Sequence, residues 1–156
     1  MALGQPLLVA IEGWLAFQFA LPSVGLHPRI ELVHPAKIAA LRYQGFIPNS
    51  GGENAPDRRP VAAAPRDVVA VYSDNTQTIY LAEGWTGTTP GELSILVHEM
   101  VHHLQNVGGL KYQCTQAREQ FAYLAQDRWL GLFGHSLEQD FELDAFSILV
   151  RTKCMY

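Results

Sequence analysis

The sequence predicts an α+β domain in which a small antiparallel or mixed sheet packs on a buried helix. Two β-rich runs, at 68–72 and 78–81, are joined by turn-forming residues at 73–76, and together they predict a hairpin. The segment between Pro90 and Gly108 carries apolar side chains on nearly every side, which is typical of a helix buried in a core. At 156 residues the chain is long enough for one core, so 1–156 is treated as a single domain.

Composition narrows the classes of function. The chain is 48% hydrophobic and 17% charged with a net charge of −4, and its Lys and Arg residues form no stripe, so no nucleic acid is expected as a partner. The apolar stretch 6–21 is too short to span a membrane. Glu12 interrupts it and nothing basic precedes it, so neither a membrane span nor a signal peptide is expected. Nothing in the sequence specifies an oligomeric state.

The part of the chain before the hairpin predicts two helices, a strand and a loop. Apolar residues recur at helical spacing over 6–21, which predicts a core-facing helix. Residues 29–34 alternate like a half-buried strand, and Pro35 opens a short helix that reaches Tyr43. Residues 47–66 hold four prolines and two glycines without periodicity, so we expect a flexible loop that is either disordered or a functional lid.

The helix after the hairpin has clear start and stop signals, and it carries the most informative residues. Thr89-Pro90-Gly91-Glu92 is a capping box with proline at the first helical position, and Gly108-Gly109 ends the helix. His98 and His102 are four residues apart, so both imidazoles lie on one side of the helix. Two neutral imidazoles supply half of a tetrahedral zinc site. Because unpaired polar groups are costly in a buried helix, metal binding is favoured over a packed helix without metal.

With Glu99 between the histidines, the pattern is the H-E-x-x-H of zinc peptidases, in which the glutamate activates the metal-bound water. A catalytic zinc takes three protein ligands, so one more is required. The downstream candidates are Cys114, Glu119, Asp127, His135, Glu138, Asp140, Glu142 and Asp144. Glu119 is preferred, because a second helix packed antiparallel after the chain reversal would bring its first turns over His102. The alternative is a solvent-facing glutamate that pairs with Arg118.

Two further helices are predicted. Cys114 or Thr115 starts the first, which runs to about Leu132, and a last helix covers 137–150 after a cap at Ser136. Within that last helix Asp144 has apolar neighbours, so we expect it to be buried and to orient a ligand imidazole, with Asp127 as the second choice.

His98-Glu99-x-x-His102, followed by Glu119-x-x-Ala122-Tyr123, resembles the gluzincin group of zinc metallopeptidases, in a short form similar to the minigluzincins. The likeness covers about residues 68–130. It implies a zincin-like fold, zinc ligation by the two histidines and Glu119, and Glu99 as the general base. It also implies a peptide or protein substrate that pairs in extended form with one strand of the hairpin, and the strand that holds Ile79-Tyr80-Leu81 is preferred. Thermolysin-like members have an aspartate where this chain has Tyr123, and they carry a C-terminal subdomain for which this chain is too short.

Other polar residues are assigned roles near the site. His103 could bind a second group, donate to the oxyanion or hold the helix by a hydrogen bond, and the structural role is favoured. Tyr112, Tyr123 and His135 are candidate electrophilic helpers, but a packing or surface role is favoured for each.

The two cysteines bear on the compartment. Cys114 and Cys154 could form a disulfide, which is slightly favoured over two free thiols and points to an extracytoplasmic or secreted protein.

Three functions are compatible with these features. The first is a zinc peptidase, the second is a zinc-stabilised module that binds a peptide or protein without cleaving it, and the third is a latent peptidase covered by 47–66 or by the N-terminal helix.

Overall fold

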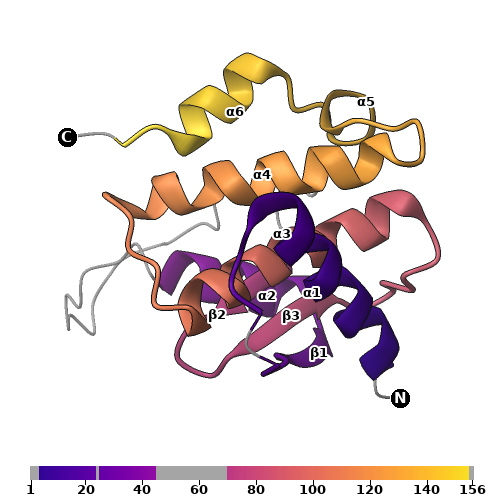
Figure 1. Cartoon of the computed structure of the whole chain (residues 1–156), viewed down its shortest axis with the longest axis vertical. Helices are drawn as coiled ribbons and strands as arrows, with labels where there is room; N and C mark the ends of the chain where they lie inside the picture. The colour runs from indigo at the N-terminus through magenta and orange to yellow at the C-terminus, as the bar shows by residue number, and fades with distance from the viewer. Residues whose placement is uncertain (1–3, 24, 45–69, 155–156) are drawn as a thin grey trace.

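The computed structural model describes residues 4–23, 25–44 and 70–154; the predicted loop at 47–66 and the first two residues of the strand predicted at 68–72 lie outside them. The described residues form six α-helices and a three-stranded sheet, which confirms the α+β class (Figure 1). In chain order the elements are α1 (Gln5–Phe19), β1 (Arg29–Val33), α2 (Pro35–Gln44), β2 (Ala70–Ser73), β3 (Thr78–Ala82), α3 (Pro90–Val107), α4 (Thr115–Gly131), α5 (Leu137–Phe141) and α6 (Ala145–Thr152).

The sheet is mixed, with the strand order β1-β3-β2. β2 and β3 form the predicted antiparallel hairpin, with Ser73 opposite Thr78, and β1 lies parallel to β3 on its other side, with Arg29 opposite Thr78. The strand that holds Ile79-Tyr80-Leu81 is therefore central, and both of its edges are used. The prediction that this strand pairs with substrate is wrong, because a central strand has no unpaired backbone groups to offer. Among the described strands, β2 is the edge next to the cleft considered below.

The main core lies between the sheet and α3. Ile79 and Leu81 are fully buried and belong to one apolar cluster with residues of α1, α3 and α4. Tyr80 points to the opposite face, where Lys37 of α2 lies over its ring, so α2 covers that side of the sheet. Figure 1 shows the remaining layers: α4 runs beside α3, and α5 and α6 lie on the far side of α4.

The N-terminal end of α3 forms only half of the predicted capping box. The Thr89 hydroxyl accepts the Glu92 amide hydrogen, as expected. The Glu92 carboxylate, however, accepts hydrogen bonds from Thr86 and from the Thr88 amide in the preceding loop. Glu92 thus joins the loop after β3 to the first turn of α3. At the other end, Gly109 has a φ of 66° and ends the helix, as predicted.

The C-terminal region differs from its prediction. The single helix expected over 137–150 is wrong, because Glu142 adopts a left-handed conformation (φ 55°) and separates α5 from α6. Asp144 caps α6, and its carboxylate accepts the Ser147 amide hydrogen at 2.7 Å. The disulfide between Cys114 and Cys154 is present, and it joins the start of α4 to the end of α6. Within the described residues, no helix combines the length and the apolar character needed to cross a membrane.

Candidate metal centre

The site is built on two neighbouring antiparallel helices. Gln105 near the end of α3 bonds the Arg118 carbonyl at the start of α4, whereas Ser94 near the start of α3 bonds Gln126 farther along α4. These pairings show that α4 returns along α3 in the opposite direction. The predicted chain reversal is confirmed, and it brings the first turns of α4 over His102.

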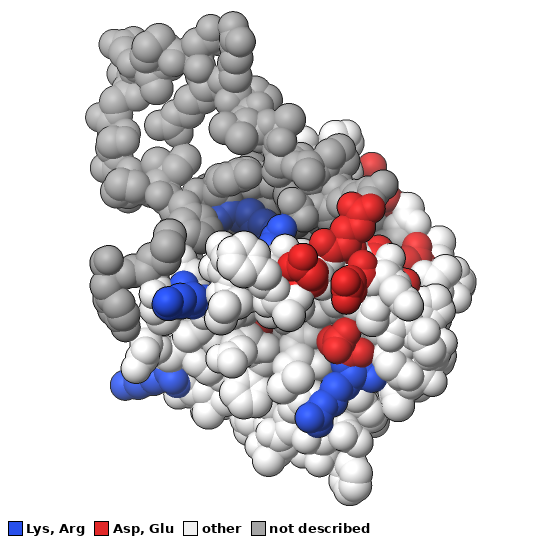
Figure 2. Space-filling model, turned by 90° about the horizontal axis from the view of Figure 1, so that it is seen from above, with Lys and Arg blue, Asp and Glu red and all other residues white. Residues whose placement is uncertain are grey.

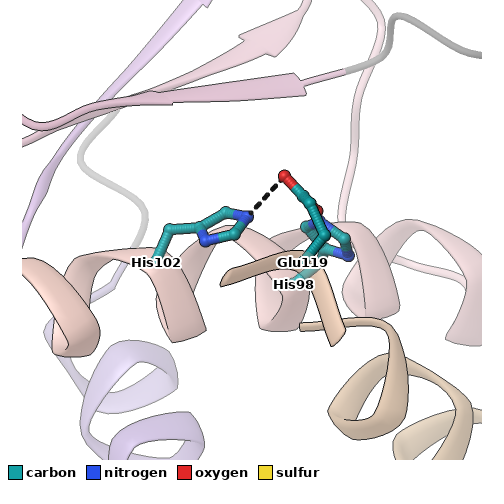
Figure 3. Close-up of side chains that lie close together, drawn as sticks. All are labelled: His98, His102 and Glu119. Carbon is teal, nitrogen blue, oxygen red and sulfur yellow. Dashed lines mark hydrogen bonds and ion pairs between the residues drawn. The ribbon is translucent and has the colours of Figure 1, made fainter. Parts of the chain in front are cut away.

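His98, His102 and Glu119 converge at the centre of this helix pair (Figure 3). The Glu119 carboxylate lies between the imidazoles, with one oxygen 2.8 Å from His98 Nε2 and the other 3.1 Å from His102 Nε2. One potential ligand atom from each residue falls within 4.8 Å of the others, so the group could hold a metal ion. Both histidines are buried, at 5% and 7% exposure.

The hydrogen position on His102 follows from its neighbours. Its Nδ1 lies 2.9 Å from the side-chain oxygen of Gln105, whose amide nitrogen donates to the Arg118 carbonyl. A backbone carbonyl can only accept, so the Gln105 nitrogen must face Arg118 and its oxygen must face the imidazole. His102 therefore carries a hydrogen on Nδ1, and in the neutral imidazole the lone pair is on Nε2, on the side of Glu119.

His98 is oriented in the same way by a second glutamine. Its Nδ1 lies 2.9 Å from the Gln126 oxygen, while the Gln126 amide donates to the Ser94 hydroxyl and that hydroxyl donates to the Gly91 carbonyl. This series of hydrogen bonds also ends on a backbone carbonyl, which can only accept a hydrogen. In their neutral form both imidazoles thus direct an Nε2 lone pair toward one point, whereas an imidazole that is protonated on both nitrogens donates its Nε2 hydrogen to Glu119. Hydrogen bonds like those to the two glutamines orient metal-ligating histidines in proteins. The donor atoms fit a divalent metal.

The electrostatics of the site favour a cation between these groups. Burial alone would raise the pKa of Glu119, but the charge of His102 and hydrogen bonds from both imidazoles hold it far below its usual range. Burial would lower the pKa of His102, and the Glu119 carboxylate raises it instead. The carboxylate is therefore ionised, and it pairs with positive charge at the two Nε2 atoms, whether that charge is carried by imidazole hydrogens or by a metal ion.

A cleft of about 530 Å³ opens over this group. The helix α3 forms its floor with His102 and Glu99, while α2 and β2 contribute to one wall and α4 and α6 to the other. Glu99 is 4% exposed, and its carboxylate makes no hydrogen bond with any residue that the structure describes. It faces the cleft beside the group that could hold a metal ion.

Tyr123 and His103, two of the predicted helpers, lie in different surroundings. The Tyr123 ring stands edge-on to His98, with ring centroids 4.8 Å apart, and the residue lines the cleft. His103 faces away: its Nε2 donates to the Leu26 carbonyl and its Nδ1 accepts from the Tyr72 hydroxyl. His103 thus ties α3 to the sheet and to the segment before β1, in agreement with the structural role that was favoured.

The prediction that Asp144 or Asp127 orients a ligand imidazole is contradicted. Asp144 is exposed at the cap of α6, and the Asp127 carboxylate accepts the Leu137 amide hydrogen. Gln105 and Gln126 hold the imidazoles instead. Their spacing gave a usable signal, because residues three after His102 and seven after Glu119 lie on the ligand-bearing faces of their helices.

Two other candidate helpers lie elsewhere. His135 pairs with Asp140, and Tyr112 lines a separate polar pocket beside the end of α3.

Comparison with known proteins gives one match. The family described as "Domain of unknown function (DUF6647)" matches residues 2–156. No curated protein and no solved structure matches the chain.

Proposed function

The chain belongs to the DUF6647 family, a domain of unknown function, and on the chemistry of the site we propose that it is a zinc-dependent hydrolase that cleaves peptide bonds. The observation that carries the proposal is the pair of glutamine-oriented imidazoles, which direct two Nε2 lone pairs and the Glu119 carboxylate to one point beside Glu99.

Zinc is the metal that suits this set of donors best. Two imidazole nitrogens and one carboxylate oxygen are ligands of catalytic zinc sites, which keep a fourth position open for water or substrate. When bound there, zinc would polarise a carbonyl group and lower the pKa of a coordinated water. The open cleft over His102 and Glu119 supports this reading, because a purely structural zinc site is closed by a fourth protein ligand.

Glu99 is the proposed general base. Its position on α3, between the two histidines and facing the cleft, lets its carboxylate take a proton from the attacking water and later pass it to the leaving amine. The edge strand β2 is proposed to hold an extended substrate, because Val71 and Tyr72 line the same cleft and an edge strand can pair with a further chain. The edge strand β2 beside the cleft, the helix α3 that carries both histidines, and the following helix α4 that carries Glu119 also support a zincin-like fold.

Variants at the site test the proposal. After saturation with zinc and dialysis, wild type and Glu99→Gln are expected to retain one zinc ion per chain, whereas His98→Ala and Glu119→Ala lose it. Cleavage of a peptide library is expected to fall by about 10²- to 10⁴-fold in Glu99→Gln. Glu138→Gln, an exposed carboxylate of α5, is the control and should match wild type in both assays.

Two results would contradict the proposal. Full zinc content in Glu119→Ala would exclude Glu119 as a ligand. Equal peptide turnover in wild type and Glu99→Gln would favour a zinc-stabilised peptide-binding module over an enzyme.

An extracytoplasmic location is part of the proposal. The disulfide between Cys114 and Cys154 supports it, because such bonds persist in oxidising compartments.

A further inference from the structure

Two arginines that the hydrolase proposal does not use lie at the cleft. Arg42 comes from α2 and Arg151 from α6, and both are half-buried. They line the main cleft and also a smaller chamber that continues from it past His98 and Glu99. The protein carries a net charge of −4, and in Figure 2 acidic side chains gather on one part of the face while basic ones are scattered. Three arginines and three carboxylates line the main cleft, but the residues that line the smaller chamber include both of these arginines and one carboxylate, that of Glu99. The chamber therefore has an excess of positive groups in a protein of negative net charge.

The chamber has a size and lining that suit a small anionic group. Its volume is about 50 Å³, which exceeds the roughly 10–15 Å³ needed for one water and accommodates a group of a few heavy atoms. Ala70, Ile95 and Phe141 supply apolar wall, and the two guanidinium groups supply hydrogen-bond donors. A carboxylate has this size, and guanidinium groups bind it with two parallel hydrogen bonds.

Other charged groups also line the cleft. Asp74 forms an ion pair with Arg118 at 2.8 Å, and Glu119 lies between the two metal-binding imidazoles. Burial and the charge of Glu119 raise the pKa of Tyr123, but Arg151, through its charge and a hydrogen bond, and the charge of Arg42 oppose that rise. Both arginines therefore act on the side chain that stands next to His98.

We propose that Arg42 and Arg151 form a carboxylate-binding subsite, so that the substrate carries a carboxylate on the residue next to the scissile bond. This inference rests on the proposed hydrolase function and names its substrate class. The placement follows from the lining, because the chamber that holds both arginines also reaches His98 and Glu99. The carboxylate comes either from the C-terminus of a peptide or from an Asp or Glu side chain, and the two sources present the same group to the arginines.

Matched peptides distinguish these sources. One peptide is prepared with a free C-terminal acid and with a C-terminal amide, and a longer amidated peptide is prepared with Glu or Gln beside the cleaved bond. We expect zinc-loaded wild type to prefer the carboxylate form of one pair by about 10- to 100-fold in kcat/KM, mainly through KM. Arg42→Gln and Arg151→Gln should remove that preference, and Arg151→Lys should restore part of it. Arg29→Gln, at an exposed position of β1, is the control and should keep the preference.

A binding measurement separates this inference from the hydrolase proposal. The same peptide pairs are titrated calorimetrically into zinc-loaded Glu99→Gln protein, with and without Arg151→Gln. Arginine-dependent preference for the carboxylate form without any cleavage by wild type would support the subsite and overturn the hydrolase. Cleavage of carboxylate and neutral forms at equal efficiency would overturn the subsite alone. An equal loss of kcat for both forms in Arg151→Gln would also overturn it, because that result assigns the arginine to the oxyanion.

Discussion

Replacing Gln126 with leucine tests the hydrogen-bond chain that orients His98. In the wild type, the Gln126 oxygen accepts the His98 Nδ1 hydrogen, so Nε2 keeps its lone pair for the metal. Leucine has a similar size and accepts no hydrogen bond. The metal-free variant can then move the imidazole hydrogen to Nε2, where Glu119 accepts it at 2.8 Å. Zinc binding would force that hydrogen back to Nδ1, where nothing accepts it.

The size of the effect follows from burial. His98 and Gln126 are each 5% exposed, so water cannot readily replace the lost acceptor. A buried donor without a partner costs about 1–3 kcal/mol. Because this cost falls mainly on the metal-bound state, it corresponds to roughly a 5- to 150-fold weaker affinity for zinc, in line with the 10- to 100-fold losses usual for such partners of ligating histidines.

The assay is the zinc dissociation constant, measured by competition with a chromophoric chelator at fixed pH. Thermal unfolding of the metal-free proteins shows whether each variant remains folded. Gln120→Leu, an exposed position on the same helix, is the control and should bind zinc like wild type. A folded Gln126→Leu protein with wild-type affinity would refute the argument that glutamine sets the position of the imidazole hydrogen.

Three further predictions concern stability. The disulfide joins residues 40 positions apart, and closing a loop of that length stabilises the fold by about 4 kcal/mol. The double variant Cys114→Ser, Cys154→Ser should therefore unfold at a lower urea concentration than wild type. An unchanged unfolding midpoint would contradict this prediction. Burial would raise the pKa of Glu12, but hydrogen bonds from the Gly25 amide, Ser23 and His27 lower it below 4.5. As the pH falls, Glu12 takes up its proton in the unfolded chain before it does so in the folded protein. The stabilisation that the Glu12 carboxylate provides is therefore complete above pH 4.5 and is lost as the pH falls through its folded pKa. Glu12→Gln should show a flatter dependence of the unfolding free energy on pH than wild type, and equal dependence in both proteins would refute the prediction. His103→Leu leaves the Leu26 carbonyl without its donor, so the free energy of unfolding should fall by about 1–3 kcal/mol. The zinc content, measured by elemental analysis, should stay at one ion per chain. Loss of zinc would instead assign His103 to the metal site.

Local signals predicted most elements well. The hairpin, the start of α3 at Thr89 and the reversal into α4 each depend on residues close in the sequence, and each is confirmed. The pairing of β1 with β3 joins residues about 50 positions apart, and no local pattern specifies it. For that reason the sequence does not reveal that β3 is central, and of the two hairpin strands it favours β3 where the structure has β2 beside the cleft.

The site was predictable to the extent that helical spacing determines it. His98 and His102 share a face because four residues make about one turn, and Glu119 meets them because α4 returns along α3. The contributions of Arg42 and Arg151 depend on how α2 and α6 are placed around the cleft, which sequence spacing does not reveal. Asp144 was misassigned because apolar neighbours on both sides indicated burial, whereas its short carboxylate caps the next helix.

The covalent link between the start of α4 and the end of α6 matters for how the protein is prepared. Cys114 lies five residues before the carboxylate that faces the imidazoles, and Cys154 lies three residues after the arginine at the chamber. Material from a reducing host and material from an oxidising secretory route can therefore differ at both places while sharing one sequence. Titration of free thiols belongs before any comparison of metal content or turnover between batches, since only batches of equal thiol status report on the same molecule.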